Sequence, residues 1–515
     1  MATAFPPTPE QLAIIDAAAN SKSNLMVFAF AGTGKTTAIE FMVPHLPTRS
    51  VLLLAFNKKN CIDLERVFIE PRGQEPPLAP WVTVRSFNAL GHRAFASAIG
   101  RRLILDDKKI SKLTTAYTKK LGGVSDDEWG NLSNLVKRAR MLGLVPQKYL
   151  QSRRSLLSDD SWGWESAAES INLELSEQLM VGAREILCGS IDLAQAGTID
   201  FDDQIYMSVL FSGLYQKFDT VICDEGQDIS HLNRLQLLKS CGKRLIVAGD
   251  QKQGIYAFRG ADGESLKKIK EEVKGDWIDL PLTVTWRCPK VVVARQLDHA
   301  PTYTAAPEAP EGTLIDLQAE KSWTIGSAEG ALMPSAILCR NNAPIISMAF
   351  ALLRKRIGIK VLGREFGKSL TSLVKKISGE ATSLETFVPA FTAWKEKEVR
   401  LALAADKETK ADRVTDQYES IMAVIESLST GAGAPELLFA IEQLFEKADG
   451  QIILSSGHKA KGLEWHTVLH LDPWRIPSRF AARNPIAMEQ ELNLRYVIET
   501  RAKNTLILAN LEQFT

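Results

Sequence analysis

A lysine and two threonines follow a run of small residues near the start of the chain, in residues 29–37 (AFAGTGKTT). An apolar run, residues 25–28, precedes this stretch, and a helical pattern follows it. Small residues let backbone N–H groups converge on phosphate oxygens, and a helix N-terminus adds positive potential. Lys35 can reach the β- and γ-phosphates of a nucleotide, and the Thr36 hydroxyl can bind Mg²⁺. The stretch predicts a phosphate-binding loop, although Ala29 stands where the full pattern has glycine.

Two adjacent carboxylates, Asp224 and Glu225, follow a second apolar run, residues 218–223. Such a pair at a strand end usually serves as the cap of a helix. Together with a phosphate-binding loop, however, the pair suits ATP hydrolysis. Asp224 can hold Mg²⁺ through its water shell, and Glu225 can orient or deprotonate the attacking water. We therefore expect ATP and Mg²⁺ as cofactors.

Alternating strands and helices must position these residues. In the first part of the chain we expect helices at 9–20, 35–42 and 57–68, and strands at 25–30, 51–55, 81–85, 218–223 and 244–248. In a second part we expect strands at 314–317, 335–338, 360–362, 452–455, 467–471 and 505–509. Strands that alternate with helices predict α/β units with parallel sheets.

Two mainly helical segments interrupt this alternation, at residues 91–198 and 371–445. The second is highly charged, and we expect it to pack lightly on its core, with a flexible joint at 431–435. The first is locally basic, and its cluster predicts a surface that follows phosphates, with a merely solvated helical surface as the alternative. The cluster comprises Arg101, Arg102, Lys108, Lys109, Lys112, Lys119, Lys120, Lys137, Arg138 and Arg140.

Composition narrows the class of protein. The chain has 515 residues, enough for several domains, and a net charge of +1, so any nucleic-acid surface must be local. Its six cysteines are scattered singly, which argues against a zinc site, an iron–sulfur cluster or a disulfide scaffold. We see no signal-peptide pattern and no apolar run near ~20 residues, so we expect a soluble cytoplasmic protein without membrane contact.

The motifs in their order resemble those of the UvrD/Rep-type superfamily 1 DNA helicases over nearly the whole chain. Alanine at position 29 is common in that family, whereas Asn88, Gly226 and Trp286 replace its usual His, Ala and Tyr. The motif sequences at residues 29–37 and 55–58 are most similar to those of the F-box DNA helicase branch and its prokaryotic or viral relatives, although no F-box segment is evident. The matching stretches are 9–11 (PEQ), 29–37 (AFAGTGKTT), 55–58 (AFNK), 85–88 (RSFN), 200–203 (DFDD), 224–228 (DEGQD), 249–261 (GDQKQGIYAFRGA), 285–289 (TWRCP), 338–343 (LCRNNA), 458–465 (HKAKGLEW) and 496–503 (YVIETRAK).

The resemblance implies a fold of two RecA-like P-loop cores, each an α/β unit with a parallel sheet and a mainly helical insertion. Residues 1–90 and 199–275 would form the first, ATP-binding core, with 91–198 as its basic insertion. Residues 276–370 and 446–515 would form the second core, with 371–445 as a short helical insertion.

The resemblance also implies roles at the nucleotide. Arg287 and Arg501 would contact the γ-phosphate, which guanidinium suits because it forms two parallel hydrogen bonds with phosphate oxygens. Gln253 would sense that phosphate. Trp286 would stack on adenine, with an interior aromatic residue as the alternative. The remaining nucleotide-binding residues would be Gln11 on the adenine, Ala31, Gly32, Thr33, Gly34, Lys35, Thr36 and Thr37 on the phosphates, and Glu464 on the ribose beside Gly462.

For nucleic acid, the resemblance implies stacking of bases on Tyr256 and Phe258, with Arg259 beside them. Aromatic faces accept any base, so such a grip does not depend on sequence. Phe56 would close a base pocket. Asn57 and Phe87, from the same and the next motif, and His458, on the DNA backbone, complete the set. Core packing is the alternative for the rings, and a satisfied loop histidine is the alternative for His458.

We therefore expect an ATP-driven translocase and helicase on single-stranded DNA and on single-strand/duplex junctions. The family's polarity implies 3′-to-5′ movement, with a role in DNA repair, recombination or replication. One alternative is a motor subunit of a nuclease or defence complex that strips or senses DNA without unwinding alone, with a nuclease or repair factor as partner. The other is a DNA-structure sensor in which ATP only gates binding.

Overall fold

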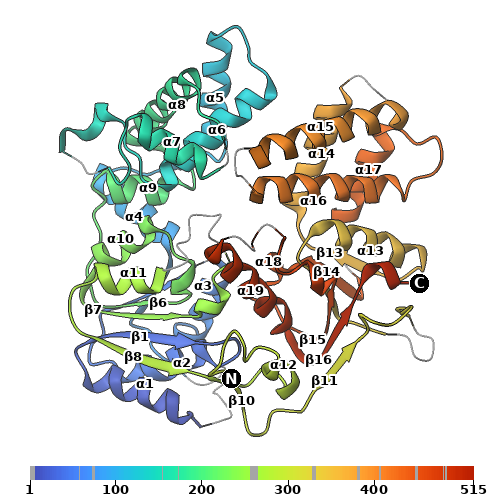
Figure 1. Cartoon of the computed structure of the whole chain (residues 1–515). Coiled ribbons are helices and arrows are strands. Elements are labelled where there is room, and N and C mark those ends of the chain that lie inside the picture. Colours follow the sequence, from blue (N-terminus) through green and yellow to red (C-terminus); the bar gives the residue numbers. More distant parts are fainter. Residues whose placement is uncertain are drawn as a thin grey trace. The chain divides into compact units, whose positions relative to one another are not determined.

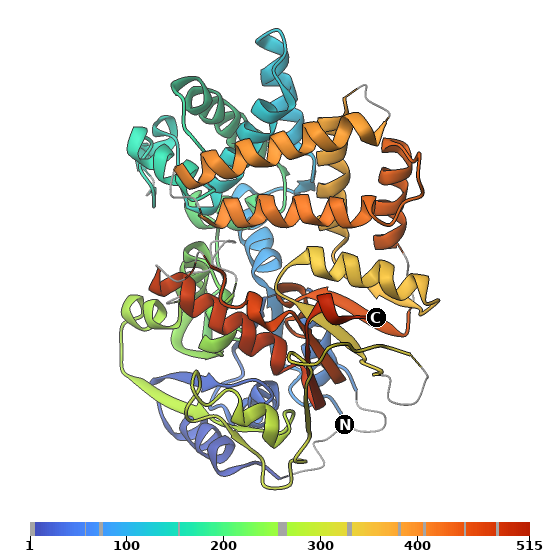
Figure 2. The same ribbon diagram turned by 45° about the vertical axis from the view of Figure 1, so that its right-hand side comes forward.

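A computed structural model of the chain, drawn in Figures 1 and 2, describes most of residues 6–515. The contacts within the chain divide it into two compact units. The first comprises Met1–Ala29 and Gly34–Leu282, and the second comprises Phe30–Thr33 and Thr283–Thr515. The residues not described are 1–5, 57, 72–75, 153–154, 172, 256–264, 327–331, 380–382, 405–407, 447–449, 480 and 482–483.

The first unit is built on a six-stranded parallel sheet of order β3-β2-β6-β7-β1-β8. The predicted parallel α/β architecture is confirmed here. The edge strand β8 was not predicted, and it extends this sheet past residue 275. The strands are β1 (Asn24–Ala29), β2 (Val51–Ala55), β3 (Val82–Ser86), β6 (Phe218–Cys223), β7 (Cys241–Gly249) and β8 (Trp277–Leu282).

Both faces of this sheet are buried, which explains the near-continuous apolar runs of its strands. Alternate residues of β2 enter two different cores: Leu53 packs on one face, and Leu52 and Leu54 pack on the other. Residues of α1 (Pro9–Asn20), α2 (Lys35–Met42) and α3 (Lys58–Phe68) belong to the first core. The second core includes residues of α4 (Phe87–Ile99), α10 (His231–Ser240) and α11 (Ser265–Glu272).

The predicted helical insertion of the first unit forms a hydrophobic core of its own. Leu135, Trp164 and Leu187 are fully buried there and pack with Tyr206 and Met207 of α9 (Asp203–Leu210). A small parallel pair, β4 (Ile104–Leu105) and β5 (Thr198–Ile199), closes its base. Its helices are α5 (Lys109–Lys120), α6 (Asp126–Met141), α7 (Ser161–Glu169) and α8 (Glu177–Gln195).

The second unit is also built on a six-stranded parallel sheet, of order β11-β16-β15-β12-β14-β13. All six of its strands were predicted. They are β11 (Thr313–Asp316), β12 (Ala336–Cys339), β13 (Ile359–Val361), β14 (Ile452–Ser456), β15 (Trp465–Leu471) and β16 (Ala502–Ala509). Around it lie β9 (Val284–Thr285), β10 (Thr304–Ala305), α12 (Lys290–Ala294), α13 (Asn342–Arg354), α18 (Gly457–Ala460) and α19 (Pro485–Glu499).

The helices inserted in this unit pack far more tightly than we expected. They are α14 (Arg364–Ser378), α15 (Leu384–Ala404), α16 (Glu408–Ile425) and α17 (Ala434–Glu446), of which α15 and α16 lie side by side (Figure 2). Phe387 and Phe391 stack on each other and are almost completely buried, in one cluster with Ile346 of α13 and Ile337 of β12. The prediction of light packing is therefore wrong. The inserted helices carry many charges, but they also carry apolar residues at helical spacing, and these residues belong to the same core as the sheet.

The predicted flexible joint at 431–435 is a short turn. Gly433 forms an antiparallel bridge with Ser383, and α17 already begins at Ala434. Removing these helices would therefore open the core of the second unit. None of the helices in the described residues is long and apolar enough to cross a membrane.

Candidate functional site

The phosphate-binding loop follows β1 and leads directly into α2. Gly32 and Gly34 have φ angles of +72° and +77°, a left-handed conformation that favours glycine. A Cβ on Gly34 would also lie 3.0 Å from Nε2 of Gln11. Gln11 itself is buried and forms a capping box with Thr8 at the start of α1. The adenine-reading residue of the family pattern is thus packed beside the loop within the first unit.

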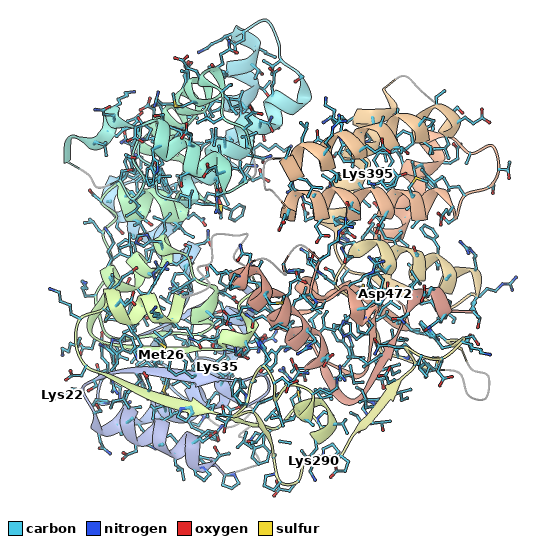
Figure 3. The ribbon with its side chains drawn as sticks, in the orientation of Figure 1. Lys22, Met26, Lys35, Lys290, Lys395 and Asp472 are labelled. Carbon is cyan, nitrogen blue, oxygen red and sulfur yellow. The ribbon has the colours of Figure 1, made fainter. Side chains whose placement is uncertain are left out.

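Lys35, labelled in Figure 3, stands at the first position of α2 and contacts both carboxylates that follow β6. Its Nζ lies 3.0 Å from Oδ1 of Asp224 and 2.7 Å from Oε1 of Glu225. Burial lowers the pKa of Lys35, but the two carboxylates outweigh it and raise the pKa above its usual range. Burial also raises the pKa of Asp224, against the effect of Lys35. The structure thus brings Lys35 next to two carboxylates that stand about 190 positions further along the chain.

A chain of hydrogen bonds continues from Glu225 to the end of β7. Gln227 donates to Oε2 of Glu225 over 2.6 Å, and the N–H of Asp250 donates to Oε1 of Gln227 over 3.0 Å. Gln253 then donates to Oδ2 of Asp250 over 2.7 Å. Burial raises the pKa of Asp250 to about 6. Gln227 and Asp250 were not among the predicted site residues, although both stand inside the matched motifs.

Glu225 adopts a left-handed backbone conformation, with φ of +56°. Few residues other than glycine do so, and they persist where the surroundings hold them. Here the side chain of Glu225 is held from two sides, by Lys35 and by Gln227. The strained turn therefore places the predicted base at a defined point beside the lysine.

The oxygen donors near the loop fit a magnesium ion that is bound together with a nucleotide. Mg²⁺ is usually held by one or two carboxylates, with substrate phosphates and waters completing its shell. Asp224 offers one buried carboxylate, and Thr36 is exposed at the start of α2. Among the described residues no cluster of three or more metal-binding side chains occurs. Thr36 and Asp224 would hold the ion, which would neutralise phosphate charge.

Within the second unit, the structure brings Arg287, Glu464 and Arg501 together. Nε of Arg287 lies 2.6 Å from Oε2 of Glu464, and Nζ of Lys503 lies 3.2 Å from the other oxygen. Burial raises the pKa of Glu464, but Arg287 and Lys503 outweigh it, so this pKa is lowered. Gly462, with φ of +81°, stands in a turn two positions before Glu464.

Arg501 is a buried cation that donates hydrogen bonds to neutral oxygens. Its guanidinium reaches the carbonyls of Val497 and Leu463, at 2.9 and 3.1 Å, and the hydroxyl of Thr500. Burial, and next the charge of Arg287, lower the pKa of Arg501 to about 10. Arg501 is buried and Arg287 is partly exposed; a cation that little water screens, with a second cation nearby, attracts an anion strongly.

The first half of the phosphate loop, Phe30–Thr33, groups with the second unit by its contacts. The N–H of Ala31 donates to the hydroxyl of Tyr496, and the hydroxyl of Tyr303 donates to the carbonyl of Ala31, each over 2.7 Å. Tyr496 stands in a matched motif, but Tyr303 lies outside all of them. No sequence signal pointed to Tyr303, since its role depends on contact with a residue 272 positions away.

Trp286 is 49% exposed, so the alternative that it is an interior aromatic residue is wrong. Its backbone N–H donates to the carbonyl of Gly32 over 2.9 Å. A half-exposed indole ring can stack with a planar ligand.

The predicted nucleic-acid residues are only partly described by the structure. Phe56 and Phe87 line one hollow of about 360 Å³ in the first unit, together with Asn88 and Tyr206. Phe87 is 3% exposed and belongs to the core, so it is mostly a packing residue. His458 is half-buried in α18. The predicted contacts Asn57, Tyr256, Phe258 and Arg259 lie outside the described residues.

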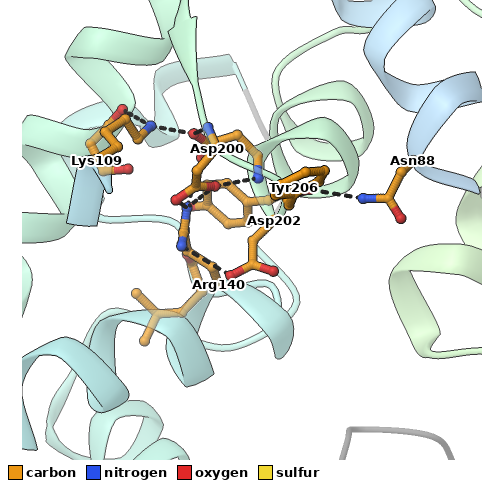
Figure 4. A network of polar contacts seen from close by, with 10 residues as sticks. Asn88, Lys109, Arg140, Asp200, Asp202 and Tyr206 are labelled. Carbon is orange, nitrogen blue, oxygen red and sulfur yellow. Dashed lines mark hydrogen bonds and ion pairs between the residues drawn. The ribbon is translucent and has the colours of Figure 1, made fainter. Parts of the chain in front are cut away.

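A buried ionic cluster joins the first insertion to the DFDD stretch (Figure 4). Nη1 of Arg140 lies 2.9 Å from both oxygens of Asp200 and 2.9 Å from Oδ1 of Asp203. Its Nη2 lies 3.1 Å from Asp202. Lys109 contacts Asp203 and donates to the carbonyl of Ser190. Lys109 and Arg140 are each 1% exposed.

The prediction that the basic cluster forms a surface that follows phosphates is therefore wrong for Lys109 and Arg140. Burial lowers the pKa of Lys109, whereas the three aspartates outweigh burial and raise the pKa of Arg140. Both cations neutralise carboxylates inside the protein and cannot reach a phosphate backbone. The sequence pattern could not separate them from Lys112 and Lys120, which are exposed and pair at the surface with Asp106 and Glu185.

Replacing Arg140 should destabilise the first unit strongly. Arg140→Met would leave Asp200 and Asp203 buried without their main cation, which we expect to cost about 3–5 kcal/mol of unfolding free energy. Arg138→Met, on the same helix, is the matched control. Arg138 donates to the Ser170 hydroxyl, and its loss should cost no more than about 1.5 kcal/mol. Urea-induced unfolding measures both, and equal losses would contradict a stabilising cluster.

The glycine loop, the lysine and the carboxylate pair at the carboxyl ends of parallel strands define a P-loop nucleotide-binding α/β protein. Comparison with family models makes the assignment narrower. Residues 8–274 match the UvrD/REP helicase N-terminal domain, and residues 368–513 match the UvrD-like helicase C-terminal domain. The chain belongs to the UvrD/Rep helicase family, which confirms the resemblance.

Individual relatives support this family. The chain is 24% identical to F-box DNA helicase protein 1 of Schizosaccharomyces pombe, over 97% of this chain and 57% of the relative. It is 23% identical to F-box DNA helicase 1 of Gallus gallus, over 98% of this chain and 49% of the relative. It is 22% identical to the ATP-dependent DNA helicase PcrA of Leuconostoc citreum, over 50% of this chain and 34% of the relative. The chain thus spans about half the length of the F-box relatives that it matches.

Proposed function

We propose that this protein is an ATP-dependent DNA helicase that moves 3′ to 5′ along single-stranded DNA. Its substrates would be single strands and single-strand/duplex junctions, in repair, recombination or replication. Family membership and the names of the relatives support this proposal. The observation that carries it is the hydrogen-bonded chain from Lys35 and Glu225 through Gln227 and Asp250 to Gln253.

That chain offers a route from hydrolysis to the nucleic acid. Cleavage and release of the γ-phosphate would remove the anion next to Lys35 and Gln253. The partners of both side chains would then change, and with them the hydrogen bonds to Glu225 and Asp250. Gln253 precedes Tyr256, the first proposed stacking residue, by three positions. A small shift of this segment would therefore act directly on the bound bases.

The other nucleotide contacts are proposed by residue type and surroundings. Arg287 and Arg501 would stabilise the charge of the γ-phosphate, since Arg501 is a buried cation and Arg287 is a second cation near it. Trp286 would stack on adenine with its exposed ring. Gln11 would read the adenine edge, and Glu464 would bind the ribose.

ATP turnover in the presence of different nucleic acids tests this proposal. We expect strong stimulation by single-stranded DNA, with weaker stimulation by blunt duplex DNA or RNA. Unstimulated turnover would contradict the proposal and favour a structure sensor in which ATP gates binding. A strand-displacement assay on the isolated chain then separates a helicase from a motor subunit, because the latter would hydrolyse ATP without unwinding.

Phe258→Ala should weaken the grip on single strands without affecting basal hydrolysis. One base stack contributes roughly 1–3 kcal/mol, so the affinity should fall by about that amount. Binding is measured by fluorescence anisotropy, and ATP turnover is measured without DNA. Loss of basal turnover in this variant would instead assign Phe258 to the protein core.

A further inference from the structure

An exposed tryptophan follows β15 at the carboxyl edge of the second sheet, outside the matched motifs. Trp474 is 62% exposed and stands in the turn Pro473–Arg475. The strand order around it is β15-β12-β14, and His458 follows β14. Neighbouring strands are about 4.8 Å apart, so Trp474 and His458 follow strand ends separated by roughly 10 Å. The tryptophan therefore shares a sheet edge with a proposed DNA contact.

Asp472, labelled in Figure 3, accepts two hydrogen bonds beside the turn that carries Trp474. Asp472 is buried and has φ of +51°, a conformation that its surroundings must stabilise. Its carboxylate accepts a hydrogen bond from the N–H of Leu511 over 2.8 Å and another from Nε of Arg475 over 2.9 Å. These hydrogen bonds define the turn, and the ring of Trp474 stands exposed on it, where it gains little from burial.

Beside the ring lies a hollow of about 370 Å³ that is lined by both acidic side chains and arginines. Asp412, Asp416 and Glu419 enter it from one face of α16, at spacings of four and three residues. Arg475 lines the hollow, with its guanidinium carbon 4.7 Å from the centroid of the Trp474 ring. Arg479 also lines the hollow.

The carboxylates in the hollow differ in their hydrogen-bond and ion-pair partners. Asp416 accepts hydrogen bonds from the N–H groups of Asn342 and Ala343, and Asp412 pairs with Arg340 at 2.7 Å. Glu419 is more loosely held, 3.9 Å from Nη1 of Arg475. Its oxygens can therefore accept hydrogen bonds from a ligand.

This arrangement suits a nucleobase better than a phosphate. Three carboxylates and three arginines line the hollow, so its charge is balanced and does not favour an anion, whereas the edge of a base carries N–H groups from which a carboxylate such as that of Glu419 can accept hydrogen bonds. The ring of Trp474 provides a stacking face, and Arg475 and Arg479 provide positive charge for the backbone. A base would enter and its phosphate would stay at the arginines.

We propose that Trp474 is a stacking platform for one base of single-stranded DNA on the second unit, with the base edge at Glu419. The proposal rests on the proposed function, because it takes the occupant to be the translocated strand. It adds a contact on a segment that none of the matched motifs includes.

Binding of a fluorescent single-stranded oligonucleotide without ATP tests this contact. Trp474→Ala should weaken binding by roughly 5- to 100-fold, as expected for the loss of one stack, whereas Trp474→Phe should keep most of the affinity. Phe439→Ala is the matched control, since Phe439 is 64% exposed on α17 of the same unit, and its affinity should equal that of the wild type. Truncation at such exposed positions should leave folding intact.

A strand with 2-aminopurine at successive positions provides a second readout. One position should be quenched by stacking in the wild type and in Trp474→Phe, and should become bright in Trp474→Ala. If Trp474→Ala binds like the wild type while DNA still stimulates ATP turnover, this proposal is wrong and the proposed function stands. Equal losses in Trp474→Ala and Phe439→Ala would also overturn it. A wild type that neither binds single strands nor responds to them would overturn both.

Discussion

Glu225→Gln should reduce ATP turnover stimulated by single-stranded DNA by on the order of 100-fold or more, while ATP binding persists. Glutamine keeps the shape of the side chain, but its single acceptor oxygen can keep only one of the two hydrogen bonds that Glu225 accepts from Lys35 and Gln227, at 2.7 and 2.6 Å. It cannot take a proton from water. The substitution therefore removes the base while Lys35 and the phosphate-binding loop, which would hold ATP, stay unchanged.

Two further variants make this experiment specific. Lys35→Ala should lose a similar factor in turnover but also bind ATP more weakly, because it removes the charge next to the phosphates. Glu271→Gln, at an exposed position of α11, should behave like the wild type. Steady-state hydrolysis and equilibrium binding of a fluorescent ATP analogue provide the two readouts. Near-normal turnover in Glu225→Gln would assign the base to another residue.

Arg501→Ala should also reduce stimulated turnover by on the order of 100-fold or more. Arg501 is a buried cation with neutral hydrogen-bond partners and a second cation, Arg287, nearby. Such a group is costly to bury unless an anion joins it, which the γ-phosphate would do in the reaction. The expected loss is therefore a loss of transition-state stabilisation.

Arg501→Lys keeps the charge but not the two parallel hydrogen bonds, so we expect an intermediate loss of turnover. This variant also guards against a folding defect, because a lysine still fills most of the site. Thermal unfolding of both variants is measured beside their hydrolysis rates. Near-normal turnover in a folded Arg501→Ala protein would exclude a role at the γ-phosphate.

The elements of this protein follow closely from local patterns in the sequence. Parallel strands buried on both faces need continuous apolar runs, and the run at Val51–Ala55 is a strand as predicted. The edge strand β8 was missed because Asp279 and Pro281 interrupt its apolar pattern. An edge position tolerates both, since one side of the strand needs no partner.

The chemistry of the nucleotide site was also visible in residue types and spacing, because a phosphate-binding loop needs small residues before a lysine at the start of a helix. Gly226, where the family usually has alanine, shows the limit of that information. A Cβ there would lie 2.4 Å from Cγ1 of Val247 on the neighbouring strand. The substitution is explained by a contact that no local pattern contains.

Whether charged and aromatic side chains are buried or exposed depended on tertiary structure alone. Arg140 and Lys109 looked like surface cations, but Asp200 and Asp203, some 60 to 94 positions further on, draw them into the interior. Phe391 lies in the charged segment that we expected to pack lightly, yet it fills the core of the second unit. Composition and periodicity record what a residue can do, whereas burial depends on partners that only the folded chain brings within reach.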